Sequence, residues 1–74
     1  MNSRRPVQTV SKDIQGHMVL IEVYRTTNGY AGKWCCLNCS LSGSKAGSHR
    51  TIDGAIAAEE WSAAFALDRP CRPP

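Results

Sequence analysis

Three of the four cysteines fall within five positions, in the segment KWCCLNCSLSG at residues 33–43. Cys36 and Cys39 have the C-x-x-C spacing of a zinc knuckle, and His49 and Cys71 could complete a set of four ligands. The same spacing occurs in redox-active dithiols. Cysteine also serves as a small apolar residue in protein cores. The segment therefore fits a metal site, a redox site or a partly buried strand.

The neighbouring residues favour the strand. Because side chains alternate between the two faces of a strand, Cys36 and Cys39 would point to opposite faces within residues 33–41 and could not share a metal. The stretch CLNC has no Gly or Pro to form a tight turn, and Cys71 stands alone near the end. A redox dithiol would instead open a helix. We expect neither a metal nor any other cofactor, and a zinc-stabilised domain is the alternative.

The chain is short, with 74 residues, 42% apolar residues and a net charge of +3. A chain of this length forms one domain with a thin core. It carries no catalytic motif and has no room for an enclosed pocket, so we expect no enzymatic activity. Because neither a signal peptide nor a membrane-spanning run is visible, we expect a cytoplasmic protein that does not enter a membrane and whose thiols stay reduced.

The order of the elements predicts the fold class. Residues 17–26 and 33–41 are rich in strand-forming residues, and Asn28-Gly29 between them is typical of a hairpin. Residues 51–68 are rich in alanine and follow Thr51, a natural helix N-cap. We therefore predict an α+β fold in which a small antiparallel sheet of two to four strands packs against one C-terminal helix.

The chain divides into three parts. Residues 1–16 are expected to form a flexible arm or, over the β-prone patch Val7 to Val10, an edge strand. Residues 17–68 form a ββ(β)α domain, with a short third strand over Ser48 to Arg50. Residues 69–74, RPCRPP, are expected to be a disordered tail.

Matching the apolar faces of the two main strands predicts their register. Val23 then pairs with Cys35, Ile21 with Leu37 and Val19 with Cys39. A two-residue turn at Asn28-Gly29 would shift one strand by one residue and turn its other face to the core. We prefer the register that buries the apolar pattern, with a longer loop or a bulge. The helix is expected to face the sheet with a broad apolar arc that includes Ala55, Trp61 and Phe65.

The predicted register leaves an apolar patch on the sheet face away from the helix. The patch contains Tyr24, Trp34, Leu20 and Met18, with the two aromatic residues opposite each other. One helix covers only one face of a small sheet, and an exposed apolar patch often marks an interaction surface. We therefore expect another protein as the partner, with a homodimer through the same face as an alternative.

Nucleic-acid binding is a second alternative. The basic residues that could carry it are Arg4, Arg5, Lys33, Lys45 and Arg50, with exposed aromatic residues stacking on bases. Their charge is scattered and not gathered into a stripe, which disfavours this function. The two histidines, His17 and His49, lack a nearby nucleophile or carboxylate at a recognisable spacing and are expected to be polar residues at strand edges.

The stretch HMVLIEVYRTTNGYAGKWCCLNCSL followed by RTIDGAIAAEEWSAAFAL resembles small uncharacterised proteins of bacteria, phages and mobile elements. These are built as a β-hairpin or three-stranded sheet followed by one alanine-rich helix. The resemblance is one of architecture and transfers no functional residue. Some proteins of this kind act as inhibitors, so the resemblance implies a small non-catalytic interaction module or inhibitor.

Overall fold

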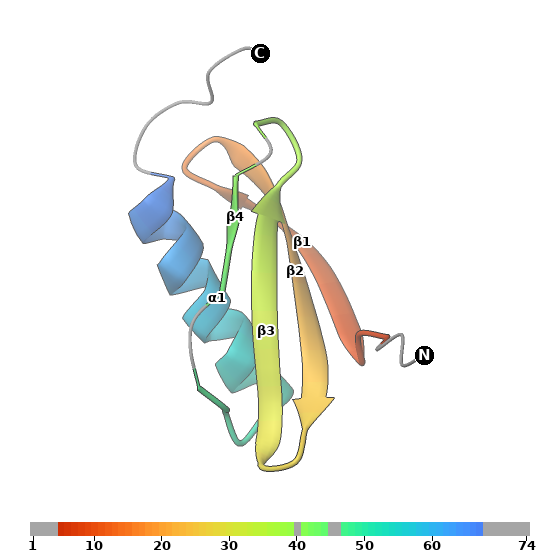
Figure 1. Ribbon diagram of the computed structural model, residues 1–74. Coiled ribbons are helices and arrows are strands. Elements are labelled where there is room, and N and C mark those ends of the chain that lie inside the picture. Colours follow the sequence, from red (N-terminus) through yellow and green to blue (C-terminus); the bar gives the residue numbers. More distant parts are fainter. Residues whose placement is uncertain (1–4, 40, 45–46, 68–74) are drawn as a thin grey trace.

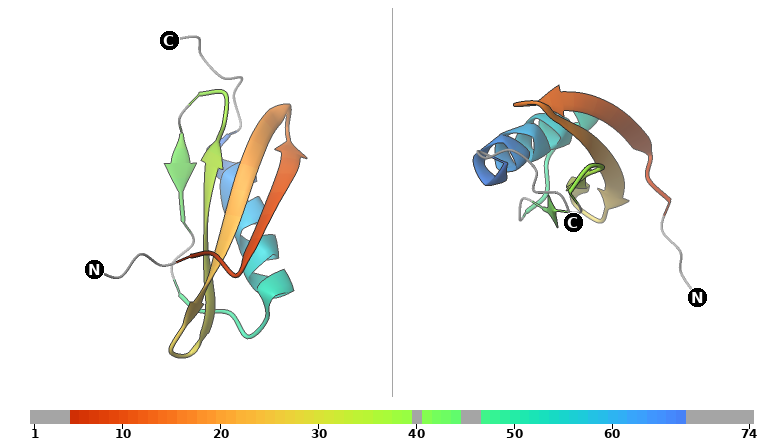
Figure 2. Two further views of the ribbon diagram at one scale, coloured as in Figure 1. Left: turned by 90° about the vertical axis from the view of Figure 1, so that its right-hand side faces the viewer. Right: turned by 90° about the horizontal axis from the view of Figure 1, so that it is seen from above.

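The computed structural model describes residues 5–39, 41–44 and 47–67, and these form one sheet and one helix. The strands pair antiparallel in the order β1-β2-β3-β4, and α1 covers one face of the sheet (Figures 1 and 2). This architecture confirms the predicted α+β class. The elements are β1 (Gln8–Ile14), β2 (His17–Thr26), β3 (Gly29–Cys36), β4 (Ser42–Gly43) and α1 (Ile52–Ala66).

Strand β1 occupies one edge of the sheet and pairs with β2 along its whole length. It continues to Ile14, beyond the β-prone patch that the sequence indicated. The turn to β2 consists of Gln15 and Gly16, with φ angles of 53° and 82°. Two consecutive positive φ angles are typical of the type I′ turn that suits a tight hairpin. The Gly16 N–H also donates to Asp13 Oδ1 over 3.0 Å.

The register between β2 and β3 differs from the predicted one. Thr26 pairs with Gly29, so a tight turn joins the strands, and Ile21 pairs with Trp34. The preferred pairing of Ile21 with Leu37 is therefore wrong. Tight turns set the register of a hairpin directly. The Asn-Gly signal indicated the correct face of β3, although the observed turn residues precede it by one position.

The apolar pattern misled because β3 is shorter than expected. It ends at Cys36, and residues 37–39 form a turn. Leu37 and Leu41 thus lie beyond the strand, where side chains no longer alternate between the two faces of the sheet, and they are 56% and 51% exposed. The predicted third strand over residues 48–50 is reduced to a single bridge between Tyr30 and His49.

The core lies between the sheet and α1, and Trp34 is part of it. Trp34 is 3% exposed, and its indole N–H donates to Ser62 Oγ on the helix over 3.2 Å. Gly43 leaves room for the ring, because a Cβ there would lie 3.0 Å from the indole. The placement of Trp34 on the exposed face is therefore wrong. The other buried apolar residues are Val19, Ile21, Val23, Cys36, Ala55, Ala63 and Leu67.

Helix α1 begins as predicted but turns a different face to the sheet. The Thr51 hydroxyl accepts from the backbone N–H of Gly54 over 2.9 Å, as an N-cap does. The buried positions are Ala55, Glu59 and Ala63, whereas Trp61 and Phe65 are 62% and 76% exposed. Because the Trp34 side chain extends from the sheet into the space between the layers, the helix contributes mainly small side chains there. The expectation that Trp61 and Phe65 face the sheet is wrong.

Candidate metal centre

His17 is brought into the core by the hairpin that precedes it. As the first residue of β2, it shares a strand face with Val19 and Ile21, which point toward the helix. Its side chain is only 2% exposed. The expected polar residue at a strand edge is therefore a buried imidazole in the core layer. Alternation from Val19 back to His17 was the signal in the sequence that could have revealed this.

Cys36 and Cys39 come together because the strand stops between them. Cys36 is the last residue of β3, faces the helix and is 3% exposed. The Cys36 N–H donates to the Leu41 carbonyl over 2.7 Å, and the Leu37 N–H donates to the Met18 carbonyl over 2.9 Å. The chain turns at residues 37–39, directly after Cys36, and Cys39 packs against the same core cluster as Cys36. Because residues 37–39 form a turn and not a regular strand, the two thiols do not point to opposite faces, and the prediction that they could not share a metal is wrong.

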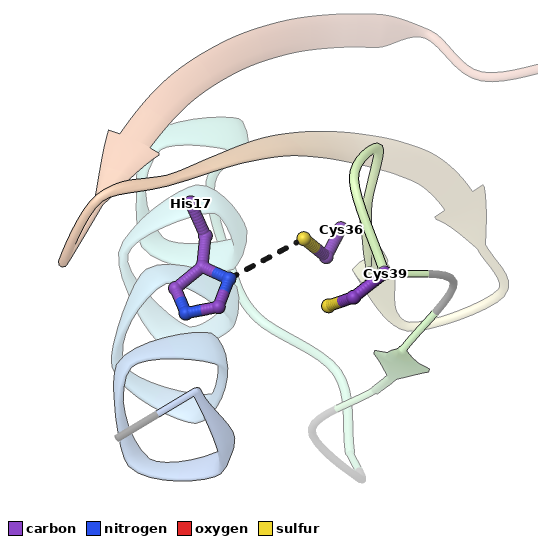
Figure 3. A group of neighbouring side chains, drawn as sticks. All are labelled: His17, Cys36 and Cys39. Carbon is purple, nitrogen blue, oxygen red and sulfur yellow. Dashed lines mark hydrogen bonds between the residues drawn. The ribbon is translucent and has the colours of Figure 1, made fainter. Parts of the chain in front are cut away.

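The three side chains converge on one point (Figure 3). Their ligating atoms lie within 4.8 Å of one another, and His17 Nδ1 lies 3.5 Å from Cys36 Sγ, within hydrogen-bonding distance. Tetrahedral zinc with Zn–S and Zn–N bonds of normal length would separate a sulfur from a nitrogen ligand by about 3.6 Å, and two sulfurs by about 3.8 Å. The observed cluster therefore needs little movement to hold a zinc ion.

The donor atoms also select the kind of metal. Two thiolate sulfurs and one imidazole nitrogen suit zinc and other soft or borderline ions. The cluster contains no carboxylate. Magnesium and calcium, which take oxygen ligands, are therefore poor candidates. No disulfide occupies the described cysteines.

Of the ligands proposed from the sequence that lie within the described residues, Cys36 and Cys39 belong to this cluster. His49 is not a member, and its backbone forms the bridge to Tyr30. Within the described residues its Nε2 atom is buried and makes no hydrogen bond. Cys71 lies outside the described residues. His17, which the sequence analysis did not consider as a ligand, takes the third position.

The sheet face away from α1, here called the outer face, keeps part of the predicted partner-binding patch. Met18 is 43% exposed, and Leu20 and Tyr24 are half-buried. Lys33 lies 5.5 Å from the centroid of the Tyr24 ring and 3.7 Å from Glu22 Oε1. Tyr24, and to a smaller extent Glu22, raise the pKa of Lys33 above its usual 10.5. The patch is therefore a mixed polar and apolar surface without Trp34.

The basic residues considered for nucleic-acid binding are only partly described. Arg5, Lys33 and Arg50 are exposed, whereas Arg4 and Lys45 lie outside the described residues. Arg5 lines a shallow depression beside Tyr24, and Lys33 lines a neighbouring one. The ion pair with Glu22 offsets the charge of Lys33. The described part of the chain thus offers a few cations around one half-buried aromatic ring.

An aromatic pair on α1 is a surface that the sequence analysis missed. The Trp61 and Phe65 rings stack at a centroid distance of 5.9 Å, and both point away from the sheet. They lie four positions apart and so are neighbours on the helix surface. The sequence did not indicate which side of this helix is buried, because alanines lie on all sides of it.

The comparisons with known proteins give no relative. No family model, curated protein or solved structure matches this chain. Within the described residues, α1 is too short and insufficiently apolar to cross a membrane. Function is therefore inferred from the chain's own geometry.

Proposed function

We propose that this protein is a small non-catalytic domain stabilised by a zinc ion that His17, Cys36 and Cys39 bind. One observation carries the proposal: residues from the start of β2, the end of β3 and the following turn place their ligating atoms within 4.8 Å of one another. His17 lies 19 positions from Cys36 in the sequence, so its approach to the two cysteines has no local reason. Cys and His are also the side chains that structural zinc sites use most.

A bound zinc ion would join the parts of the fold that the sheet alone holds weakly. β4 has only two residues, and the turn at residues 37–39 connects it to β3. A zinc ion shared with His17 would tie this turn to the first hairpin. A domain of this size has a marginal core, and a metal is a common way to supplement one. Because the assembled ligands exist only in the folded chain, binding energy would become folding energy.

The first test is native mass spectrometry of the full chain with zinc and after treatment with a chelator, combined with thermal unfolding. We expect one zinc ion per chain. At a free zinc concentration 100 times Kd, the stabilisation would be about 2.7 kcal/mol. For a domain of this size that corresponds to a rise in Tm of roughly 10–20 °C.

Cys35 provides a matched control. It is a neighbouring cysteine, half-buried, and lies outside the cluster. We expect Cys35→Ser to keep the zinc-dependent rise in Tm, and Cys39→Ser to lose most of it. A wild-type chain that takes up no zinc would contradict the proposal, as would a Cys39→Ser variant that binds zinc as well as the control does.

A second candidate function is protein binding, favoured by the exposed Trp61–Phe65 pair. The interaction surface expected from the sequence retains Met18, Leu20 and Tyr24. The largest exposed apolar side chains of the described residues, however, are Trp61 and Phe65 on α1. Because Ala57 and Ala64 flank Trp61 along the helix, an antiparallel second copy could set its Trp61 against these small residues. Such self-complementarity is typical of a two-fold dimer.

Sedimentation analysis tests this second candidate. We expect a concentration-dependent dimer in the wild type that is lost in the double variant Trp61→Ala/Phe65→Ala. The matched control is Met18→Ala/Tyr24→Ala, which changes the outer face and should leave the dimer intact. The helix-face candidate would be wrong if the control variant alone lost the dimer, or if the wild type stayed monomeric at all concentrations. Binding to nucleic acid that falls steeply with salt would instead favour the basic residues.

A further inference from the structure

The two sulfur atoms of the cluster are also close enough to be joined by oxidation. Cys36 Sγ and Cys39 Sγ lie within 4.8 Å of each other, and both residues are free cysteines. Figure 3 shows both sulfur atoms directed into the same space beside the His17 imidazole. A disulfide holds its sulfurs about 2.05 Å apart, so the two atoms would have to approach by less than about 3 Å. Rotation of a cysteine side chain between staggered positions is a movement of this kind.

The turn after β3 lets Cys39 move without disturbing the main strands. The paired register of β2 and β3 ends at Cys36, which lies opposite Val19. Cys39 lies in the turn at residues 37–39, beyond that register. A disulfide between the two cysteines would therefore tighten this turn and leave the β2–β3 hairpin paired.

The two sulfurs differ in their access to solvent. Cys36 is 3% exposed, whereas Cys39 is half-buried and therefore easier for a small oxidant to reach. Redox-sensitive cysteines are typically accessible and lie beside a second cysteine that completes the disulfide. Cys35 is also half-buried, but as the neighbour of Cys36 in β3 it points to the other face of the sheet and lies outside the cluster.

A zinc ion would hold both sulfurs in the form that reacts. Cysteine binds zinc as the thiolate, which is also the nucleophilic form of the side chain. The sequence analysis disfavoured a redox site because such a dithiol usually opens a helix, whose dipole favours the thiolate. In this cluster the metal would favour the thiolate in place of a helix.

We propose that a peroxide oxidises Cys39, and that Cys36 converts the product into a disulfide, which releases the zinc ion. This inference rests on the proposed zinc-binding function. The Cys39 thiolate attacks one oxygen of hydrogen peroxide, the O–O bond breaks, and the departing hydroxide takes a proton from the buffer to form water. Cys39 is then a sulfenic acid.

The second step joins the two cysteines. The Cys36 thiolate attacks the Cys39 sulfur, the S–O bond breaks, and the second hydroxide takes a proton to form a second water. The two sulfurs together lose two electrons, which reduce the peroxide. Because neither sulfur of a disulfide is a thiolate, the zinc ion keeps only His17 of the three ligands and leaves the protein.

Peroxide treatment of the zinc-loaded full chain tests the proposal. One equivalent of hydrogen peroxide is added, and released zinc is measured with a coloured chelator too weak to strip the untreated protein. Disulfides are mapped by mass spectrometry. We expect release of one zinc ion per chain, loss of two of the four free thiols, and a disulfide between Cys36 and Cys39. A dithiol reductant with fresh zinc should restore the loaded protein.

Two further measurements test the order of the steps and the choice of cysteines. Dimedone, which traps sulfenic acids, should label Cys39 and not Cys36 during a brief exposure to peroxide; labelling mainly at Cys36 would overturn the assignment of the first step. Cys35→Ser is the matched control, because it removes a half-buried thiol outside the cluster. This variant should release zinc at the wild-type rate.

The failure of the inference is distinguishable from that of the proposed function. If the wild-type chain binds zinc and peroxide does not release it, the inference is wrong and the zinc site stands. The same conclusion follows from a disulfide that uses Cys35, Cys71 or a second chain, or from a Cys35→Ser variant that keeps its zinc. If the wild-type chain binds no zinc, the proposed function fails and the inference fails with it.

Discussion

Replacing either tryptophan with phenylalanine tests the orientation of both layers of the fold. The chain has two tryptophans, and the structure gives them opposite surroundings: Trp34 is 3% exposed and Trp61 is 62% exposed. The sequence pattern alone had placed Trp34 on the outer face and Trp61 in the core. The variants Trp34→Phe and Trp61→Phe therefore give opposite results under the two arrangements.

The cost of each substitution follows from its contacts. Trp34→Phe removes the hydrogen bond from the indole N–H to Ser62 Oγ, worth about 1 kcal/mol. It also removes part of a buried ring, and the lost packing costs about another 1 kcal/mol. We expect a total loss near 2 kcal/mol in the free energy of unfolding. Trp61→Phe changes an exposed ring and should stay within about 0.5 kcal/mol.

Urea unfolding followed by circular dichroism measures the two effects, with all variants at the same zinc concentration. A domain of this size has an m-value near 1 kcal/mol/M, so the midpoint of Trp34→Phe should fall by about 2 M. Fluorescence gives an independent check, because each variant retains one tryptophan. The ring left in Trp61→Phe should be shielded from acrylamide, and the ring left in Trp34→Phe should be quenched readily. Equal midpoints, or the reverse order of quenching, would refute the arrangement of sheet and helix described above.

Three further substitutions test individual contacts, each by urea unfolding. Thr51→Ala should cost about 1 kcal/mol through loss of the helix cap, whereas Thr51→Ser keeps the hydroxyl and should change little; equal losses would argue against capping. Gly32→Ala would place a Cβ 2.6 Å from Glu59 Cγ and should cost about 1–3 kcal/mol, and an unchanged midpoint would mean that Glu59 moves aside freely. Lys12→Ala breaks an ion pair with Glu60 at the surface, so we expect a loss below about 1 kcal/mol that shrinks in high salt. A loss that does not depend on salt would point to packing by the lysine stem.

Much of the fold could be predicted from local patterns. The strand at residues 17–26, the hairpin after it and the helix that Thr51 begins all follow from side-chain type and spacing over short distances. Strand β1 was the weakest of these signals, because most of its residues are polar and exposed. Such a strand is stabilised by backbone pairing with β2, and the pattern of apolar residues in the sequence does not reveal this pairing.

The candidate site could be predicted only in part. The spacing of Cys36 and Cys39 indicated a zinc knuckle, but the assumption of a continuous strand separated their side chains. β3 ends where the chain turns back toward β4: Cys35 pairs with Ser42, and the Cys36 N–H bonds to the carbonyl of Leu41, just before β4. The third ligand, His17, lies 19 positions from Cys36 in the sequence and joins it only when the sheet is assembled.

The sequence by itself determined the strand β2, the hairpin that follows it and the helix α1, because helix caps, turn residues and alternating side chains act over a few positions. Only the tertiary structure decided which faces of β3 and α1 are buried. A shift of one residue in a hairpin exchanges the two faces of a strand. A helix with alanine on all sides can bury either side. Here the bulk of Trp34 between the layers favours burial of the helix side that carries Ala55 and Ala63 over the side that carries Trp61 and Phe65. The same register that buries Trp34 brings Cys36 to His17, and so the core and the candidate metal site were decided together.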